Sequence, residues 1–96
     1  MNLKKEGLEK IRKEIDSIDE EIISLIAKRY EFVKSATDFK DSEKSVLATE
    51  RQKEMNRKRK LIAKKHNLPI DLIESVYSKM IKYFTEKQME LWQKRK

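Results

Sequence analysis

The chain has 96 residues, which is the length of a single domain. Its single Gly, single Pro and 43% charged residues are typical of long helices with few turns. The absence of Cys excludes disulfides and thiolate metal sites, and the lone His66 excludes a multi-histidine zinc site. The sequence shows neither a signal peptide nor a membrane-spanning run, so we expect a cytoplasmic protein without a membrane partner. The net charge of +7 fits a solvated basic surface, a nucleic-acid partner or a small anionic substrate, and it does not choose among them.

The first predicted element is one long helix from about Lys4 to Phe39. At about 1.5 Å per residue it would measure roughly 54 Å, which is longer than a compact globule of this chain length. A second copy could cover the whole apolar stripe of such a rod, so we predict a homodimer. The stripe follows an alternating spacing of three and four, typical of a heptad pattern, and consists of Leu8, Ile11, Ile15, Ile18, Ile22, Leu25, Phe32, Ala36 and Phe39.

One heptad position of this helix carries a cation. Arg29 stands where the series Leu8, Ile15, Ile22 requires an apolar residue. A cation in a packed seam costs several kcal/mol unless it is paired. Either Arg29 extends to solvent or to a Glu, or the seam opens there around an anion. Lys40 lies three helical turns further on and projects from nearly the same face.

The sequence after the first helix predicts a polar loop and two more helices. Residues 41–47 interrupt the periodicity and are expected to form the loop. A basic helix follows from about Ala48 to Lys65, and Pro69 begins a third helix that runs to about Gln93. Gln88 lies at the edge of the inward stripe of the third helix. There it is either a core amide whose hydrogen bonds are satisfied or a contact to a ligand. The expectation is an all-α fold with three helices in a single domain over residues 1–96.

The chemistry-bearing residues are cations and amides rather than nucleophiles. No glycine-rich phosphate loop is present, and an enzyme with this composition would act by positioning and electrostatics. Guanidinium groups bind carboxylates in bidentate fashion, so these residues suit a small dicarboxylate. A coiled-coil interaction module and a basic helical nucleic-acid-binding protein remain alternatives at this point. The donors at apolar or boundary positions are Arg12, Arg29, Lys40, Arg51 and Gln88.

From Leu8 to about Trp92 the chain resembles the all-helical chorismate mutases, and within them the subgroup that includes isochorismate-pyruvate lyases. Each matching segment is short, but their order and spacing together are specific. The segments are Leu8-Glu-Lys-Ile-Arg-Lys-Glu-Ile-Asp16, Ala27-Lys-Arg29, Phe39-Lys-Asp-Ser-Glu43, Ala48-Thr-Glu-Arg51 and Tyr83-Phe-Thr-Glu-Lys-Gln88.

The resemblance implies an intertwined homodimer with two active sites and no cofactor or metal. It implies that Arg12 reaches into the partner's site and, together with Arg29, binds the two substrate carboxylates. Lys40 and Gln88 would be the catalytic donors to the ether oxygen whose bond breaks. Further substrate-binding positions implied by the resemblance are Ala48, through its backbone, and Arg51, Gln52 and Phe84.

Two activities follow from the resemblance. Chorismate mutase, which serves aromatic amino acid biosynthesis, is favoured by Gln52, because the best-known bacterial mutases have a hydroxyl-binding Glu there. Isochorismate-pyruvate lyase, which forms salicylate and pyruvate, is the alternative. It is favoured by the Phe39-Lys-Asp-Ser-Glu43 segment and by the pair Gln88 and Trp92. On either interpretation the partner is a small dicarboxylate, and we expect no specific nucleic-acid binding.

Overall fold

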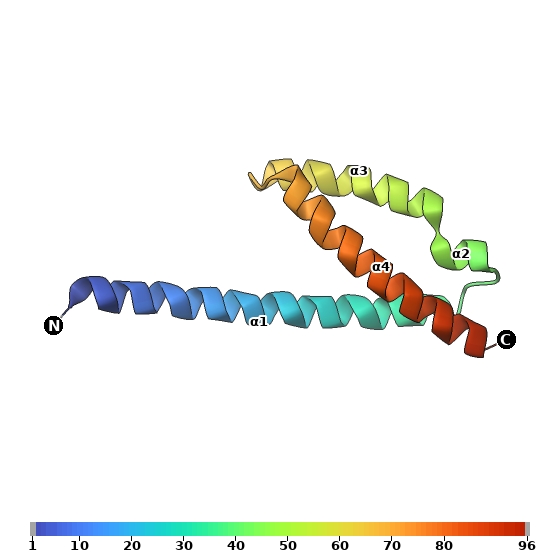
Figure 1. Ribbon diagram of the computed structural model, residues 1–96, viewed down its shortest axis with the longest axis horizontal. Coiled ribbons are helices and arrows are strands. Elements are labelled where there is room, and N and C mark those ends of the chain that lie inside the picture. The colour runs from blue at the N-terminus through green and yellow to red at the C-terminus, as the bar shows by residue number, and fades with distance from the viewer. Residues whose placement is uncertain (1, 96) are drawn as a thin grey trace. The chain divides into compact units, whose positions relative to one another are not determined.

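The computed structural model describes residues 2–95, which form helices and no strand. The four helices are α1 (Leu3–Thr37), α2 (Glu43–Leu47), α3 (Thr49–Lys65) and α4 (Ile70–Lys94) (Figure 1). The all-α prediction is confirmed, and the three long helices begin and end within about two residues of the expected positions. None of the helices in the described part of the chain is long and apolar enough to cross a membrane.

The chain divides into two compact units, Met1–Phe32 and Val33–Lys96. The first unit is most of α1. Its apolar stripe is exposed along its whole length, from Leu8 at 46% to Ile11 at 59% and Phe32 at 77%. No apolar side chain among residues 2–32 is buried, so the predicted apolar stripe of this helix packs against nothing within the unit.

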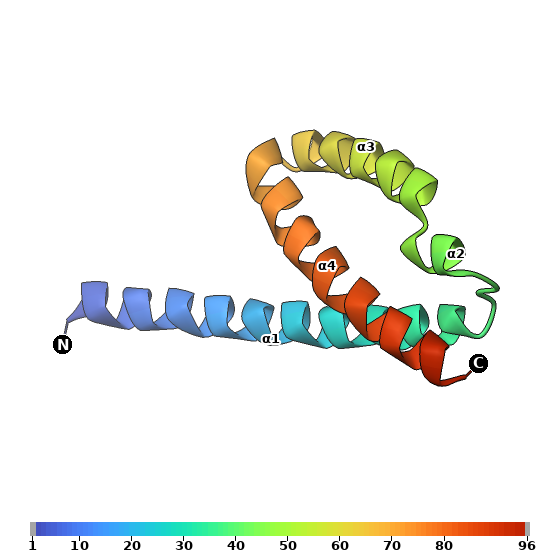
Figure 2. The same cartoon turned by 45° about the vertical axis from the view of Figure 1, so that its right-hand side comes forward.

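The second unit is a helical hairpin with a short helix beside it. Figures 1 and 2 show α3 leading through the turn at residues 66–69 into α4, which runs back along it. The helix α4 packs against both α3 and α2. The buried apolar residues of this unit are few, namely Val46 on α2, Ala63 on α3 and Trp92 on α4.

The hairpin turn between α3 and α4 follows from its sequence. Asn67 has a φ of 56°, in the left-handed region that Asn tolerates better than most residues. The N–H of Leu68 donates to the carbonyl of Ala63 at 2.9 Å, and the N–H of Asn67 donates to that of Lys64 at 3.1 Å. These two bonds form a Schellman motif, and Pro69 directly after it prevents the helix from continuing.

Residues 41–47 are not wholly the loop that the sequence predicts, because α2 forms within them. Ser42 caps this helix: its hydroxyl accepts from the backbone N–H of Ser45, and the Ser45 hydroxyl accepts from that of Ser42, both at 3.1 Å. Such reciprocal capping satisfies backbone donors that would otherwise destabilise so short a helix. The sequence signal was weak because Ser45 takes the place where a Glu or Gln usually completes this motif.

Candidate active site

Ala48 links α2 to α3 in a left-handed conformation. Its φ of 46° and ψ of 47° are unusual for a residue with a Cβ. Its N–H donates to the carbonyl of Lys44, and its own carbonyl accepts from the N–H of Gln52, both at 3.0 Å. A carbonyl oxygen has two lone pairs, so the Ala48 oxygen can accept a further bond from a ligand hydroxyl.

Ala48 and Arg51 line one hollow. The hollow has a volume of about 390 Å³ and is formed by α2 and the first turn of α3. The Arg51 side chain is exposed there, which suits a cation that meets a charged ligand from solvent. The other residues lining it are Ser42, Lys44, Ser45, Thr49 and Glu50.

Gln52 lines a different hollow, a groove of about 480 Å³ between α3 and α4 that also contacts Tyr77 and Ile81. Consecutive helical residues point about 100° apart, which explains why Arg51 and Gln52 face different hollows. The Oε1 atom of Gln52 is buried and accepts no hydrogen bond within the described residues. A buried acceptor without a donor is uncommon in proteins, so this oxygen is a candidate acceptor for a ligand hydroxyl.

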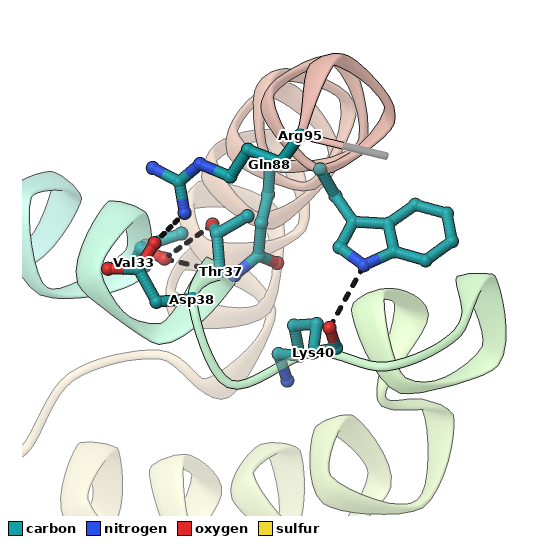
Figure 3. Close-up of polar contacts among 7 residues, drawn as sticks. Val33, Thr37, Asp38, Lys40, Gln88 and Arg95 are labelled. Atoms are coloured by element: carbon teal, nitrogen blue, oxygen red, sulfur yellow. Dashed lines mark hydrogen bonds and ion pairs between the residues drawn. The ribbon is translucent and has the colours of Figure 1, made fainter.

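Gln88 is buried, with 6% of its surface exposed, rather than at the edge of the stripe where the sequence places it. Its Nε2 donates to the backbone carbonyl of Val33 at 3.0 Å (Figure 3). The same carbonyl accepts from the hydroxyl of Thr37 at 3.2 Å, and Thr37 is itself almost fully buried. An amide nitrogen carries two hydrogens, so the bond to Val33 fixes the amide and leaves one N–H to donate elsewhere.

Lys40 lies between α1 and α2 and is half-buried. Its backbone N–H donates to the carbonyl of Thr37 at 3.2 Å, and its carbonyl accepts from the indole Nε1 of Trp92 at 3.0 Å. Sequence reasoning assigned no role to Trp92 in holding Lys40. The available signal was its spacing, since Trp92 lies one helical turn after Gln88 and therefore on the same face of α4.

Phe84 lies one turn before Gln88 on α4 and is half-buried. Its ring meets that of Tyr83 edge to face, with centroids 5.3 Å apart and an angle of 87° between the planes. This arrangement is a favourable one for two aromatic rings. Phe84, Gln88 and Trp92 therefore form a row along α4, with the buried amide between two aromatic side chains.

Arg12 and Arg29 both belong to the first unit. They are seventeen residues apart on α1, which corresponds to about 25 Å along the helix axis. The Arg12 side chain is exposed and Arg29 is half-buried. A small dicarboxylate is much shorter than this separation, so a single copy of α1 does not bring the two guanidinium groups onto one ligand.

No group of three or more His, Asp or Glu side chains within residues 2–95 is arranged to hold a metal ion. The polar groups that the resemblance assigns to the site, such as Lys40, Ala48 and Gln88, are hydrogen-bond donors and acceptors. Such groups can orient an anion and stabilise negative charge that develops on an oxygen.

The sequence matches the family described as chorismate mutase type II over residues 11–89. The chain belongs to this family. It is 33% identical over 86 residues to isochorismate pyruvate lyase from Pseudomonas aeruginosa, an alignment that covers 90% of this chain and 85% of that protein. It is also 38% identical over 86 residues to the T-protein of Haemophilus influenzae, where the match covers 86% of this chain but only 23% of that longer protein.

The predicted relationship to chorismate mutases and to an isochorismate pyruvate lyase is therefore confirmed. Membership of this family supports an enzymatic activity for the chain. The roles expected of the individual site residues stay predictions, as does the pairing of two chains.

Proposed function

We propose that the protein is a homodimeric chorismate mutase that rearranges chorismate to prephenate without covalent catalysis. The rearrangement passes through a compact cyclic transition state in which negative charge builds on the ether oxygen and no proton is transferred. An enzyme for this step needs to select the compact conformer and to surround that oxygen with fixed donors. The reaction therefore requires neither a metal nor a cofactor.

The two substrate carboxylates are bound by Arg29 of one chain and by Arg12 of the other. The separation of about 25 Å along α1 supports this division, because one copy of the helix cannot place both groups on one small molecule. Guanidinium groups suit this role because each can donate two parallel hydrogen bonds to a carboxylate.

The exposed stripe of α1 supports the dimer. Burial of apolar surface stabilises by about 25 cal/mol per Å², and residues such as Ile15 and Ile22, which are 51% and 49% exposed, leave much of this unrealised within the first unit. A second copy offers a stripe of the same length and period, which is what a heptad pattern requires of its partner. We therefore propose that α1 packs against the partner chain.

Lys40 and Gln88 donate to the ether oxygen. Gln88 is suited to this because its bond to Val33 holds the amide and leaves a second N–H. Lys40 adds a positive charge where negative charge develops. Arg51 contributes a further cation on the wall of the site, and Phe84 packs against the substrate.

The observation that carries the choice of chorismate mutase is the buried Oε1 of Gln52, which has no hydrogen-bond partner among the described residues. The substrate carries a ring hydroxyl, and a hydroxyl donates to such an oxygen. We propose that the Oε1 of Gln52 accepts from this hydroxyl.

The second candidate is isochorismate-pyruvate lyase, and 33% identity to such an enzyme over 90% of the chain favours it. Both reactions break the ether bond that joins the enolpyruvyl group to the ring. The same donors, Lys40 and Gln88, would therefore serve either reaction. The position of the ring hydroxyl differs between the two substrates, so its acceptor is the group expected to discriminate.

The direct test supplies purified protein with chorismate and with isochorismate in separate reactions and identifies the products by chromatography. We expect prephenate from chorismate, and Lys40→Ala protein serves as the matched negative control. Salicylate and pyruvate from isochorismate, without prephenate formation, would establish the second candidate instead. We expect only weak, salt-sensitive association of the basic helix α3 with nucleic acid.

The role of Gln52 is tested with Gln52→Leu, which keeps the approximate size and removes the acceptor. We expect kcat/KM for chorismate to fall about tenfold, corresponding to one lost hydrogen bond of about 1.4 kcal/mol. An unchanged kcat/KM would remove this residue from the site.

A further inference from the structure

The last two turns of α4 and the residue that caps it hold the end of α1 and the segment after it through three side chains. Gln88 bonds to Val33, Trp92 bonds to Lys40, and Arg95 forms an ion pair with Asp38. Gln88 and Trp92 are four residues apart and share one face of α4, and Arg95 is the residue that caps the C-terminus of this helix. Figure 3 shows Gln88 and Arg95 reaching toward the labelled residues of this segment.

The bond to Trp92 fixes the peptide group that follows Lys40. The peptide group before Lys40 is fixed separately, because its N–H donates to Thr37 at 3.2 Å. Both peptide planes that flank the Cα of Lys40 are thereby held. The direction of the Cα–Cβ bond follows from these two planes, since φ and ψ are the only soft backbone dihedrals.

Trp92 and Arg95 differ in how strongly they can impose this geometry. Trp92 is 8% exposed, and its indole N–H donates to the Lys40 carbonyl at 3.0 Å in a part-buried position, where water competes less than at the surface. The Arg95 and Asp38 side chains are 45% and 61% exposed. Exposed ion pairs are weak because water and salt screen them.

We propose that Trp92 is a positioning residue that acts through the main chain of Lys40 and sets the direction in which its ammonium group approaches the substrate. This inference rests on the proposed function, in which Lys40 donates to the ether oxygen. A donor that is misplaced by about 1 Å can lose up to about 10²-fold in rate, so a single remote hydrogen bond can have a large kinetic effect.

The test removes the indole N–H while retaining the ring. The sequence contains one Trp, so replacing tryptophan throughout by β-(3-benzothienyl)alanine exchanges the N–H for sulfur at this position alone. Trp92→Phe is the genetically encoded counterpart, and Arg95→Ala is the control at the C-cap of the same helix. Circular dichroism and a thermal melt establish that each protein is folded.

We expect both changes at Trp92 to lower kcat about 10-fold to 10²-fold with little change in KM, and Arg95→Ala to stay within about twofold of wild type. The deciding measurement repeats the replacements in a Lys40→Ala background. If Trp92 acts through Lys40, they cause no further loss there.

An equal fold loss in both backgrounds, or no loss in the wild-type background, would overturn the positioning role and leave the proposed function standing. Wild-type protein that turns over neither chorismate nor isochorismate would overturn the proposed function, and the positioning role would fall with it.

Discussion

The amide of Gln88 is anchored by a residue 55 positions earlier in the chain, through the 3.0 Å hydrogen bond from its Nε2 to the carbonyl of Val33. Val33 lies in the last turns of α1 and Gln88 in the second half of α4. The bond therefore ties these two helix segments together and, at the same time, sets the plane of the amide. One side chain is both a satisfied core group and a candidate donor, the two alternatives that the sequence left open.

The first prediction concerns Gln88→Glu. An ionised carboxylate cannot donate to the ether oxygen and would repel it, whereas a protonated carboxyl can donate. The ordinary pKa of Glu is about 4.3, so the introduced group is expected to be ionised at neutral pH. We predict a loss of about 10²–10³ in kcat/KM at neutral pH, by analogy with removal of an oxyanion donor, and partial recovery as the pH falls.

The control for this prediction is circular dichroism at each pH, because the introduced carboxylate also faces the carbonyl of Val33. Ionisation would break that bond as well, and protonation would restore a donor. Profiles of kcat/KM against pH that run parallel for wild type and variant would show that Gln88 does not donate to the reacting oxygen.

The second prediction concerns Arg29. If this residue interrupts the apolar seam in order to bind a substrate carboxylate, Arg29→Ala should lower kcat/KM by orders of magnitude and leave helix content unchanged. Arg29→Lys is the matched control, since it keeps the charge but loses bidentate geometry, and it should recover only part of the activity. Near-normal turnover combined with lower stability would instead assign Arg29 a structural role.

The third prediction concerns the turn at Asn67, whose φ is 56°. Gly adopts this conformation without strain, whereas Ala does so at a cost of about 1 kcal/mol. Asn67→Gly should therefore maintain or raise the free energy of unfolding, and Asn67→Ala should lower it by about 1 kcal/mol. Urea denaturation at one fixed protein concentration measures both. Greater stability of the Ala variant would contradict this account of the turn.

The long elements of the fold could be predicted because their signals are repeated many times. The stripe of α1 recurs over several heptads, and Pro69 marks the start of α4 within one residue. The helix α2 could not be predicted in this way, because five residues are too few for periodicity. Its formation depends on the pair Ser42 and Ser45, whose reciprocal bonds require a particular local geometry.

The candidate site was predictable in residue type more than in arrangement. Family resemblance identified Gln88 and Gln52. It did not indicate that a main-chain carbonyl anchors Gln88, or that the Oε1 of Gln52 is buried and accepts no hydrogen bond from residues 2–95. The resemblance also singled out Trp92, but without any role in holding Lys40. The bond between them joins residues 52 positions apart. Helical periodicity describes which face a side chain takes and carries no information on such long-range partners.

The fourth prediction is that the protein is an obligate dimer. A chain whose α1 exposes residues such as Ile11, Leu25 and Phe32 has too small a core to be stable alone. Sedimentation at micromolar concentration should show a dimer, and dilution should cause loss of helix content and of activity together. A folded and active monomer at that concentration would be inconsistent with the proposal.

Each active site is proposed to contain residues from two copies of the chain, and mixed dimers test this proposal. Arg12→Ala and Lys40→Ala proteins should each keep only about 10⁻²–10⁻³ of the wild-type activity when tested alone, because every site in either homodimer lacks one group. After subunit exchange, a hybrid dimer contains one site with both changes and one site with neither.

The measurement is prephenate formation by the mixture, with the fraction of hybrid determined by native mass spectrometry. Complete statistical exchange of equal amounts makes half of the dimers hybrid, and each hybrid has one intact site of two. We therefore expect the mixture to show about a quarter of the activity of wild-type protein at the same total concentration. Activity that stays at the level of the separate variants, although hybrid dimers are present, would contradict a site shared between two chains.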